Sequence, residues 1–417
     1  MAHPERIVII GAGHASAQLC ESLRKGGHTG SITLIGEETW LPYQRPPLSK
    51  AYLLGDFERE RLFVKPRAFY DDAGIDLRLG VRALRIDRDA RRVELSEGGA
   101  VEYDALALLT GARVRPLDCP GAGMPGVHYV RGIDDIDGLM PAVETARHAV
   151  VVGGGYIGLE AAAVLRKRGL GVTLLHRSPR LLSRVASART AAFFDALHRE
   201  EGVDIRLDTT IRSIEGAGWV ERVEIERRSA DPVAADAHEE LPADLVVAGI
   251  GVLPNQSLAV EAGLQTEDGI AVDATCRTAD PAIFAAGDVA WHPHGRWGDI
   301  RLESVQNALD QAKTCAAAML GDAAPYDAVP WFWSDQYDVK LQAAGLPQGY
   351  DAAVWRAGEK PRSGSCWLYA QGRLACVEAM NDPRAYMTGK RWIEAGISPD
   401  ATEIADPATP LKGVTAA

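Results

Sequence analysis

Two copies of one glycine-rich pattern constrain the fold of this chain more than any other feature. The apolar run 6–10 leads into residues 11–16, which read Gly-Ala-Gly-His-Ala-Ser. The apolar run 149–152 leads into residues 153–158, which read Gly-Gly-Gly-Tyr-Ile-Gly. A strand, a Gly-x-Gly-x-x-Gly turn and a helix are typical of the βαβ unit that binds a dinucleotide. Two well-separated copies predict two dinucleotide sites in an α/β protein.

Each position of the pattern has a physical role. The first glycine permits a tight turn, the second lets the backbone approach a pyrophosphate, and the third lets the helix pack against the strand. The helix N-terminus then directs N–H groups toward the phosphates. A tight turn without a ligand remains the alternative for the first copy, because its third position is a serine. The residues assigned to the two loops are Gly11, Gly13, His14 and Ser16, and Gly153, Gly155, Tyr156, Ile157 and Gly158.

Composition limits the classes of function. A chain of 417 residues with a net charge of −12 predicts two or three domains and argues against a general nucleic-acid binder. No apolar run approaches the ~20 residues of a membrane span, and residues 1–5 do not read as a leader, so we expect a cytoplasmic protein without membrane contacts. The six cysteines are scattered without a metal-ligand or Cys-x-x-Cys spacing. This spacing predicts no metal site and no vicinal dithiol.

Three further segments carry candidate chemistry. The proline pair in 40–50 predicts a rigid loop that ends in Lys50, either a ligand-facing ammonium or an ordinary surface lysine. The strand ending at Gly287-Asp288 offers a carboxylate to ligand hydroxyls, or alternatively an N-cap. The aromatic cluster 331–337 is either domain core or the cover of a flat ring. Its two tryptophans are two residues apart and share one face of a strand.

The remaining pattern predicts two mixed regions and a small α+β domain. We expect short strands with a hairpin in 75–110 and helices near 134–145 and 190–201. Further strands are expected near 203–207, 219–227, 244–250, 338–344, 351–357, 365–370 and 373–380, before a helix at 383–395.

Five stretches give the chain a family resemblance. It resembles the pyridine-nucleotide flavoprotein reductases of the glutathione-reductase fold, and among them the putidaredoxin-reductase and rubredoxin-reductase type of ferredoxin reductase. The stretches that carry this resemblance are 41–50, 153–160, 283–288, 301–308 and 330–336. The resemblance implies an α/β fold with two Rossmann-like dinucleotide-binding domains and a C-terminal α+β domain. It places an FAD-binding domain at 1–114 and 247–325, an NAD(P)-binding domain at 115–246, and the C-terminal domain at 326–417.

The same resemblance implies residue roles. Lys50 is expected beside the hydride-accepting nitrogen of the flavin, paired with Glu160, and Trp333 near the isoalloxazine on the side where an iron–sulfur partner docks. These three are the expected catalytic residues. Asp288 is expected at the ribityl chain and Val305 near the flavin ring. The other residues expected at the cofactors are Ala15, Glu37, Arg45, Ala83, Thr110, Gly111, Arg131, Gly251 and Gly287.

One departure from the family concerns the nicotinamide coenzyme. Relatives that use NADH usually carry a carboxylate where this chain has His176, and Arg177 follows. A cation there suits a ribose 2′-phosphate, whereas a carboxylate repels it. The family favours NADH and the local chemistry leans slightly to NADPH, so we expect FAD and NAD(P)H as cofactors.

The expected function is hydride transfer from NAD(P)H to FAD, followed by one-electron transfers to an acidic [2Fe-2S] ferredoxin that serves a monooxygenase or dioxygenase. A monomer or weak homodimer is expected. The alternatives are a small-molecule reductase of monodehydroascorbate or quinone type, and a redox signalling flavoprotein like apoptosis-inducing factor. The candidate docking cations for the ferredoxin are Arg296, Arg301, Lys313 and Lys340.

Overall fold

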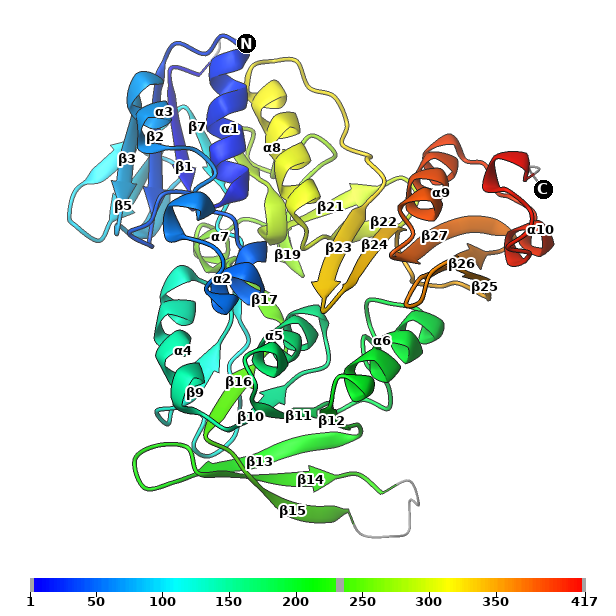
Figure 1. Cartoon of the computed structure of the whole chain (residues 1–417). Coiled ribbons are helices and arrows are strands. Elements are labelled where there is room, and N and C mark those ends of the chain that lie inside the picture. Colours follow the sequence, from blue (N-terminus) through cyan, green and yellow to red (C-terminus); the bar gives the residue numbers. More distant parts are fainter. Residues whose placement is uncertain (1–3, 230–235, 415–417) are drawn as a thin grey trace. The chain divides into compact units, whose positions relative to one another are not determined.

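The computed structural model describes residues 4–229 and 236–414 and divides them between two compact units (Figure 1). The first unit comprises the chain up to Gln44, Arg59–Arg113 and Leu253–Pro330. The second comprises Arg45–Glu58, Val114–Val252 and the chain from Trp331. The chain therefore leaves the first unit briefly at 45–58, a short excursion that the sequence does not predict.

The first unit is built on a five-stranded parallel sheet of order β20-β7-β1-β2-β3. Strand β1 shows why the sequence folds this way, because its alternate side chains enter two separate apolar cores. Ile7 and Ile9 pack under helices α1 and α8, and Val8 and Ile10 pack toward the β4–β6 sheet. A strand buried on both faces reads as a continuous apolar run. The strands are β1 (Arg6–Ile10), β2 (Ser31–Gly36), β3 (Ile75–Leu79), β7 (Ala105–Leu108) and β20 (Ile283–Ala285), and the helices are α1 (His14–Lys25) and α8 (Val305–Met319).

Smaller elements complete this unit. An antiparallel sheet of β4 (Ala83–Asp87), β5 (Arg92–Leu95) and β6 (Ala100–Glu102) contains the predicted hairpin. The other elements are η2 (Arg59–Leu62), α3 (Arg67–Asp72), β8 (Ala112–Val114), β17 (Val252–Pro254), α7 (Ser257–Glu261), β18 (Thr266–Glu267), β19 (Gly269–Ala271), η3 (Gly287–Val289), β21 (Ala290–His294) and β22 (Gly298–Arg301).

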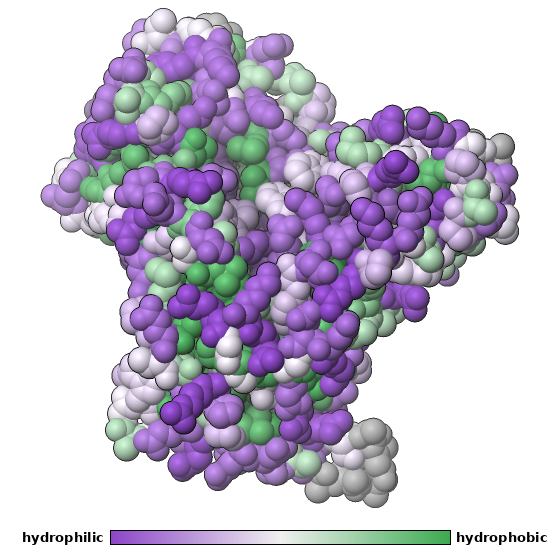
Figure 2. Space-filling view, viewed as in Figure 1, coloured by the Kyte–Doolittle hydropathy of each residue, from purple (hydrophilic) through white to green (hydrophobic). Residues whose placement is uncertain are grey.

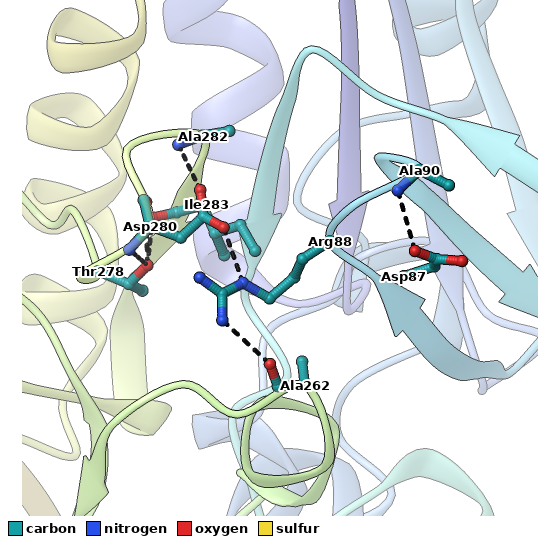
Figure 3. A network of polar contacts seen from close by, with 8 residues as sticks. All are labelled: Asp87, Arg88, Ala90, Ala262, Thr278, Asp280, Ala282 and Ile283. Atoms are coloured by element: carbon teal, nitrogen blue, oxygen red, sulfur yellow. Dashed lines mark hydrogen bonds and ion pairs between the residues drawn. The ribbon is translucent and has the colours of Figure 1, made fainter.

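A polar network joins distant parts of the first unit (Figure 3). Arg88 follows strand β4, and its Nε donates a 2.8 Å hydrogen bond to Asp280, which precedes β20. The same guanidinium donates to the Ala262 carbonyl, and Ala282 N–H donates to Asp280. Burial raises the pKa of Asp280, but the donors Ala282 and Arg88 outweigh it, so the pKa lies below its usual value. The ionised carboxylate thus ties strand β20 to the β4–β5 sheet.

The second unit contains another five-stranded parallel sheet, of order β12-β11-β10-β16-β9. The predicted helices at 134–145 and 190–201 are confirmed within two residues as α4 and α6. Strands β13 and β15, which flank β14 in an antiparallel sheet, were not predicted. The elements are β9 (Val127–Tyr129), α4 (Ile133–Thr145), β10 (His148–Val152), α5 (Tyr156–Lys167), β11 (Gly171–Leu175), α6 (Ala188–Glu200), β12 (Val203–Arg206), β13 (Thr209–Glu215), β14 (Arg222–Arg227), β15 (Ala237–Pro242) and β16 (Leu245–Ala248).

The C-terminal part of the second unit is a five-stranded antiparallel sheet of order β23-β24-β27-β26-β25, with helix α9 against it. The short excursion contributes η1 (Pro46–Ser49) and α2 (Ala51–Leu54) to this unit. The C-terminal elements are β23 (Trp331–Gln336), β24 (Val339–Gly345), β25 (Ala352–Ala357), β26 (Gly364–Ala370), β27 (Arg373–Met380), α9 (Pro383–Ala395), α10 (Ala401–Ala405) and η4 (Leu411–Gly413).

Among the described residues, no helix is both long and apolar enough to cross a membrane. On the face seen in Figure 2, hydrophobic residues interrupt a mostly hydrophilic surface and form no continuous band.

Candidate functional site

The first glycine-rich loop has the geometry of a phosphate cradle. Gly11 follows β1 with φ +107°, and a Cβ there would overlap the Leu109 carbonyl oxygen. Gly13 is the N-cap of α1, and a Cβ on it would meet nothing within 4 Å. The loop therefore needs glycine at position 11 for its own backbone. At position 13 glycine leaves open space, which is where a pyrophosphate approaches in this motif.

Ser16 fits the third position by forming hydrogen bonds instead of leaving space. Its side chain is fully buried, its hydroxyl donates to the Gly11 carbonyl, and it accepts from Gly13 N–H at 3.3 Å. The Ser16 hydroxyl holds helix α1 to the loop by hydrogen bonds, whereas a glycine would do so by allowing close packing. The serine therefore does not disrupt the turn.

The second loop repeats this geometry with all three glycines. Gly153 has φ +117°, and a Cβ there would overlap the Gly249 carbonyl oxygen. Gly155 faces open space, like Gly13. A Cβ on Gly158 would overlap the Gly153 carbonyl, so here the third glycine is sterically required.

The helices behind both loops begin without a side-chain cap. Helices α6, α8 and α9 are capped by Ser187, Ser304 and Asp382, whose side chains accept from the first turn. The N-caps of α1 and α5 are glycines with no capping side chain. Uncapped N–H groups together with the helix dipole suit a phosphate. Both loops thus fit a dinucleotide pyrophosphate.

Two side chains at the end of the second loop, Tyr156 and Ile157, differ in their surroundings. The Tyr156 ring lies 4.5 Å from the Phe332 ring of β23, and its hydroxyl donates to the Val185 carbonyl. Ile157 is 43% exposed, unusual for a large aliphatic side chain. It lies at the first turn of α5, where it is available to a ligand.

His176 follows β11 and bonds back to the second loop. Its Nδ1 accepts a 3.1 Å hydrogen bond from Gly154 N–H, so the neutral ring carries its proton on Nε2. That Nε2 is buried and makes no hydrogen bond of good geometry among the described residues, although the Arg180 backbone acts on the ring as an acceptor. Burial, assisted by Arg177 and Arg184, outweighs this acceptor and lowers the pKa of His176. The site therefore presents a neutral imidazole with a buried Nε2–H donor beside two guanidinium groups.

The other residues expected to contact the flavin lie in the first unit, mostly near strand ends and at the start of α8. Thr110 donates to the Asn255 carbonyl at 2.7 Å, and Gly287 N–H donates to Gln311 at 2.8 Å. Asp288 lies in the three-residue turn η3, so it is not the N-cap of a helix. Their neighbours among the expected residues are His14 and Ala15 at the start of α1, Glu37 exposed after β2, Ala83 buried in β4, Gly111 after β7 and Val305 as the first residue of α8.

Two residues at the start of α8 were missed by the sequence analysis. Gln306 and Asn307 are buried, and the oxygen of each side-chain amide has no partner among the described residues. Buried polar atoms without partners are rare in native proteins and point to a ligand. Both residues lie in the stretch 301–308 that carries the family resemblance, which was the available signal.

The second unit brings Lys50 and Glu160 together, as predicted. Lys50 Nζ donates to Glu160 Oε2 at 2.7 Å and to the Pro46 carbonyl at 3.3 Å. Glu160 is 2% exposed, and it also accepts from Ser49 and Ser334, each at 2.6 Å. These two serines were not predicted as site residues. Three donors, one of them charged, thus surround an almost fully buried carboxylate.

Other expected residues of the second unit lie beside these elements. Arg45 donates to the Arg131 carbonyl at 2.7 Å, which joins the loop before η1 to the segment between β9 and α4. Gly251 follows β16 with φ +106° and accepts from Arg115 N–H.

The aromatic cluster confirms the expected sharing of a face on β23. Trp331 and Trp333 stack with ring centroids 5.7 Å apart, whereas Phe332 points to the other side, against Tyr156. All three are partly exposed, so the cluster is not closed core.

The four candidate docking cations differ in availability. Lys313 and Lys340 are more than half exposed and pair with Asp310 and Asp335. Arg296 is exposed and lies over the Trp297 ring. The Arg301 side chain is only 8% exposed, held by Asp268 and Glu303. Because burial and ion pairing occupy its guanidinium, the prediction of Arg301 as a docking cation is wrong.

The cysteines of this chain are mostly buried thiols. All six cysteines are described and unpaired, and five of them are buried. Burial raises the pKa of the Cys20 thiol to about 12 and that of Cys366 to about 11. No group of His, Cys, Asp and Glu residues in the described ranges is suited to hold a metal ion.

Comparison with known proteins identifies the family. Residues 5–312 match the family described as pyridine nucleotide-disulphide oxidoreductase, and residues 331–415 match the reductase C-terminal domain. Rhodocoxin reductase of Rhodococcus erythropolis is 44% identical over 97% of this chain and 93% of its own. A ferredoxin–NAD(P)+ reductase of Sphingomonas is 43% identical, over 97% of this chain and 96% of its own.

A solved structure agrees with these relatives. The covalent complex of putidaredoxin reductase with putidaredoxin contains a chain that matches with a TM-score of 0.92 and 37% identity, covering 98% of this chain and 97% of that one. The paired glycine loops, the α/β fold and the C-terminal domain are thus those of a known group. The chain belongs to the pyridine nucleotide-disulphide oxidoreductases, in the branch that carries the reductase C-terminal domain.

Proposed function

We propose that this chain is a ferredoxin reductase that uses FAD and NAD(P)H. The observation that carries the proposal is the buried Lys50–Glu160 pair, in a chain whose described cysteines supply no dithiol. FAD and NAD(P)H are the cofactors expected for the family. Bound FAD would accept a hydride from the nicotinamide and pass its electrons one at a time to a ferredoxin.

The loop at Gly11 would hold the FAD pyrophosphate, and the loop at Gly153 would hold that of the nicotinamide coenzyme. This assigns the first unit, without the 45–58 excursion, to FAD. Residues 115–246 then form the coenzyme domain and residues from about 326 the C-terminal domain. Support comes from the open space at Gly13 and Gly155 and from the uncapped helices behind them.

Lys50 would orient the site electrostatically. Two of its three ammonium protons go to Glu160 and the Pro46 carbonyl, which leaves the third for a ligand. A fixed ammonium stabilises negative charge that develops on a neighbouring ring. Glu160, held by two serine hydroxyls, keeps the ammonium in place. Trp333 would lie against the flavin on the ferredoxin side, which its partial exposure permits.

NADPH is the coenzyme that the local chemistry favours. The buried Nε2–H donor of His176 and the nearby Arg177 and Arg184 suit the acceptors and the charge of a 2′-phosphate. The variant that tests this assignment is His176→Glu, which restores the carboxylate of NADH-dependent relatives. It should lower the ratio of kcat/KM for NADPH to kcat/KM for NADH by tenfold or more, which corresponds to about 1.4 kcal/mol. An unchanged ratio would refute the assignment.

The decisive experiment is anaerobic titration with NADH and NADPH, followed by turnover against a panel of [2Fe-2S] ferredoxins. We expect full flavin reduction and turnover with at least one acidic ferredoxin. Rapid reduction of quinone or ascorbyl radical without any ferredoxin turnover would instead indicate a small-molecule reductase. Slow turnover with a stable charge-transfer complex would indicate a signalling flavoprotein.

Lys313, Arg296 and Lys340 remain the proposed docking cations. Lys313→Glu should raise the ferredoxin KM several-fold at low salt and spare reduction of a small artificial acceptor, because surface charge steers association. Arg212→Glu is a suitable control, since Arg212 is similarly exposed and ion-paired but lies on β13. Equal losses with both acceptors would contradict a docking role. Gel filtration at several concentrations tests the expected monomer or weak dimer.

A further inference from the structure

A chain of buried polar side chains continues from Glu160 on helix α5 to His198 on helix α6. Ser334 donates to Glu160 Oε1 at 2.6 Å and accepts from Gln336 Nε2 at 3.1 Å. Gln336 Oε1 lies 2.8 Å from Nε2 of His198. Glu160 lies on α5, Ser334 and Gln336 on β23, and His198 on α6, the three elements labelled in Figure 1. The links cross three elements of one compact unit and join side chains that are at most 2% exposed.

The proton order along this chain has one direction. The Ser334 hydroxyl donates its single proton to Glu160 Oε1, so toward Gln336 its oxygen can only accept. The Ser334 oxygen then accepts from the Gln336 amide N–H, which turns the Gln336 oxygen toward His198. The imidazole must therefore donate through Nε2. Its Nδ1 is left as an acceptor 3.5 Å from the Tyr337 hydroxyl.

The state of His198 agrees with this order. Burial lowers the pKa of His198 to about 4, although the Gln336 hydrogen bond acts in the opposite direction. The ring is thus neutral near pH 7 and has one donor and one acceptor. Glutamine does not pass protons readily, so the chain does not conduct protons and instead fixes orientations.

We propose that Ser334, Gln336 and His198 are positioning residues that lock the Glu160 carboxylate, and through it the Lys50 ammonium, in one orientation. The consequence for flavin reduction rests on the ferredoxin-reductase function proposed above. A neutral donor on Oε1 leaves Oε2 to Lys50 and Ser49. Without the Ser334 hydroxyl, the Glu160 carboxylate can rotate, and the Lys50 ammonium loses its fixed position.

The first test reads the proton order directly and needs no turnover. In the FAD-loaded protein with ¹⁵N-labelled histidine, long-range ¹H–¹⁵N spectra report which ring nitrogen of His198 carries the proton, and His198→Gln assigns the signal. We expect the Nε2–H form. In Glu160→Gln, the amide oxygen stays with Lys50 and its NH₂ faces Ser334. The hydroxyl then donates to a flipped Gln336 amide, whose NH₂ requires an acceptor at Nε2, so the proton should move to Nδ1.

The Ser334→Ala background supplies the matched control. With the hydroxyl removed, Glu160→Gln should leave the His198 signal unchanged, because the link is cut. A His198 that carries its proton on Nδ1 in the native protein would overturn the proposal. So would a His198 signal that does not respond to Glu160→Gln, or one that responds equally without the Ser334 hydroxyl.

The second test measures rapid anaerobic flavin reduction. Ser334→Ala removes a hydrogen bond to the Glu160 carboxylate and should slow reduction about tenfold. Gln336→Met releases the Ser334 hydroxyl from its second partner and should slow reduction as well. Both variants should keep nicotinamide affinity and FAD content unchanged. Ser365→Ala, a buried serine of β26 that accepts from Trp367, should leave the rate unchanged. Native rates in both variants, or an equal loss in Ser365→Ala, would overturn the positioning role. Absence of ferredoxin turnover in the native protein would refute the proposed function without affecting the tautomer result.

Discussion

Replacing Lys50 with methionine separates the structural role of the Lys50–Glu160 pair from its chemical role. Methionine fills a similar volume but removes the ammonium, which leaves the Glu160 carboxylate buried with only hydroxyl donors. Removing one partner of a buried ion pair costs about 3–5 kcal/mol. We expect about 3 kcal/mol, because Lys50 is 18% exposed and two serines still donate to the carboxylate. The double variant Lys50→Met with Glu160→Gln removes the uncompensated charge and should recover most of this loss.

Flavin reduction should behave differently from stability. Loss of a fixed donor at a developing charge slows a reaction about 10²–10³-fold. We therefore expect slow reduction in both the single and the double variant, although the double variant is stable and keeps FAD. Denaturant unfolding and anaerobic rapid mixing measure the two quantities on the same preparations. If the double variant regained the native reduction rate, Lys50 would act only by compensating Glu160. If the single variant lost no stability, the energetic argument would be wrong.

Three further predictions follow from single contacts. Gly155→Ala should weaken NAD(P)H binding at least about tenfold without lowering the unfolding temperature. Gly158→Ala should lower both the coenzyme affinity and the unfolding temperature, because its Cβ would overlap a backbone carbonyl. Coenzyme titration measures the affinity, and calorimetry measures the unfolding temperature. Arg356 donates to four carbonyls of the C-terminal segment, a set of hydrogen bonds that a lysine cannot make. Arg356→Lys should therefore speed hydrogen exchange of residues 401–414 at least about tenfold. Unchanged exchange would contradict this. The low pKa of His198 predicts that the free energy of unfolding falls by about 3 kcal/mol as the pH drops from 6.5 toward 4, because the folded protein resists protonation of this ring. His198→Gln should therefore make the free energy of unfolding less dependent on pH within this window. An unaltered pH dependence would contradict the low pKa.

The sequence predicted elements well where packing follows a regular pattern. Strands β26 and β27 are buried along most of their length and read as apolar runs, and all four strands predicted in the C-terminal part are confirmed within one residue. Strand β15 was missed because five of its six residues are exposed, so it has no apolar periodicity to detect. The assignment of residues 45–58 to the second unit was also missed, because it depends on contacts with residues that are distant in the sequence.

The candidate site was predictable only in part. Repetition of the glycine pattern was visible in the sequence, and the Lys50–Glu160 pairing came from the family resemblance. No spacing rule connects Ser334 to Glu160, which lie 174 positions apart, so their contact needed the fold. Ser16 looked like a defect of the motif. Its hydrogen bonds to the loop depend on backbone positions that only the structure supplies.

The order of strands in the first sheet has a consequence for biosynthesis. Strand β7 pairs with β20, yet the ribosome completes residues 114–252 of the other unit before it reaches β20. At about 5–20 residues per second, β7 waits roughly 10–30 s for its neighbour. During this interval one edge of an apolar strand is unpaired, which is the kind of surface that favours aggregation. Slow synthesis or a shortage of chaperones should therefore reduce the yield of this protein more than its final stability would suggest.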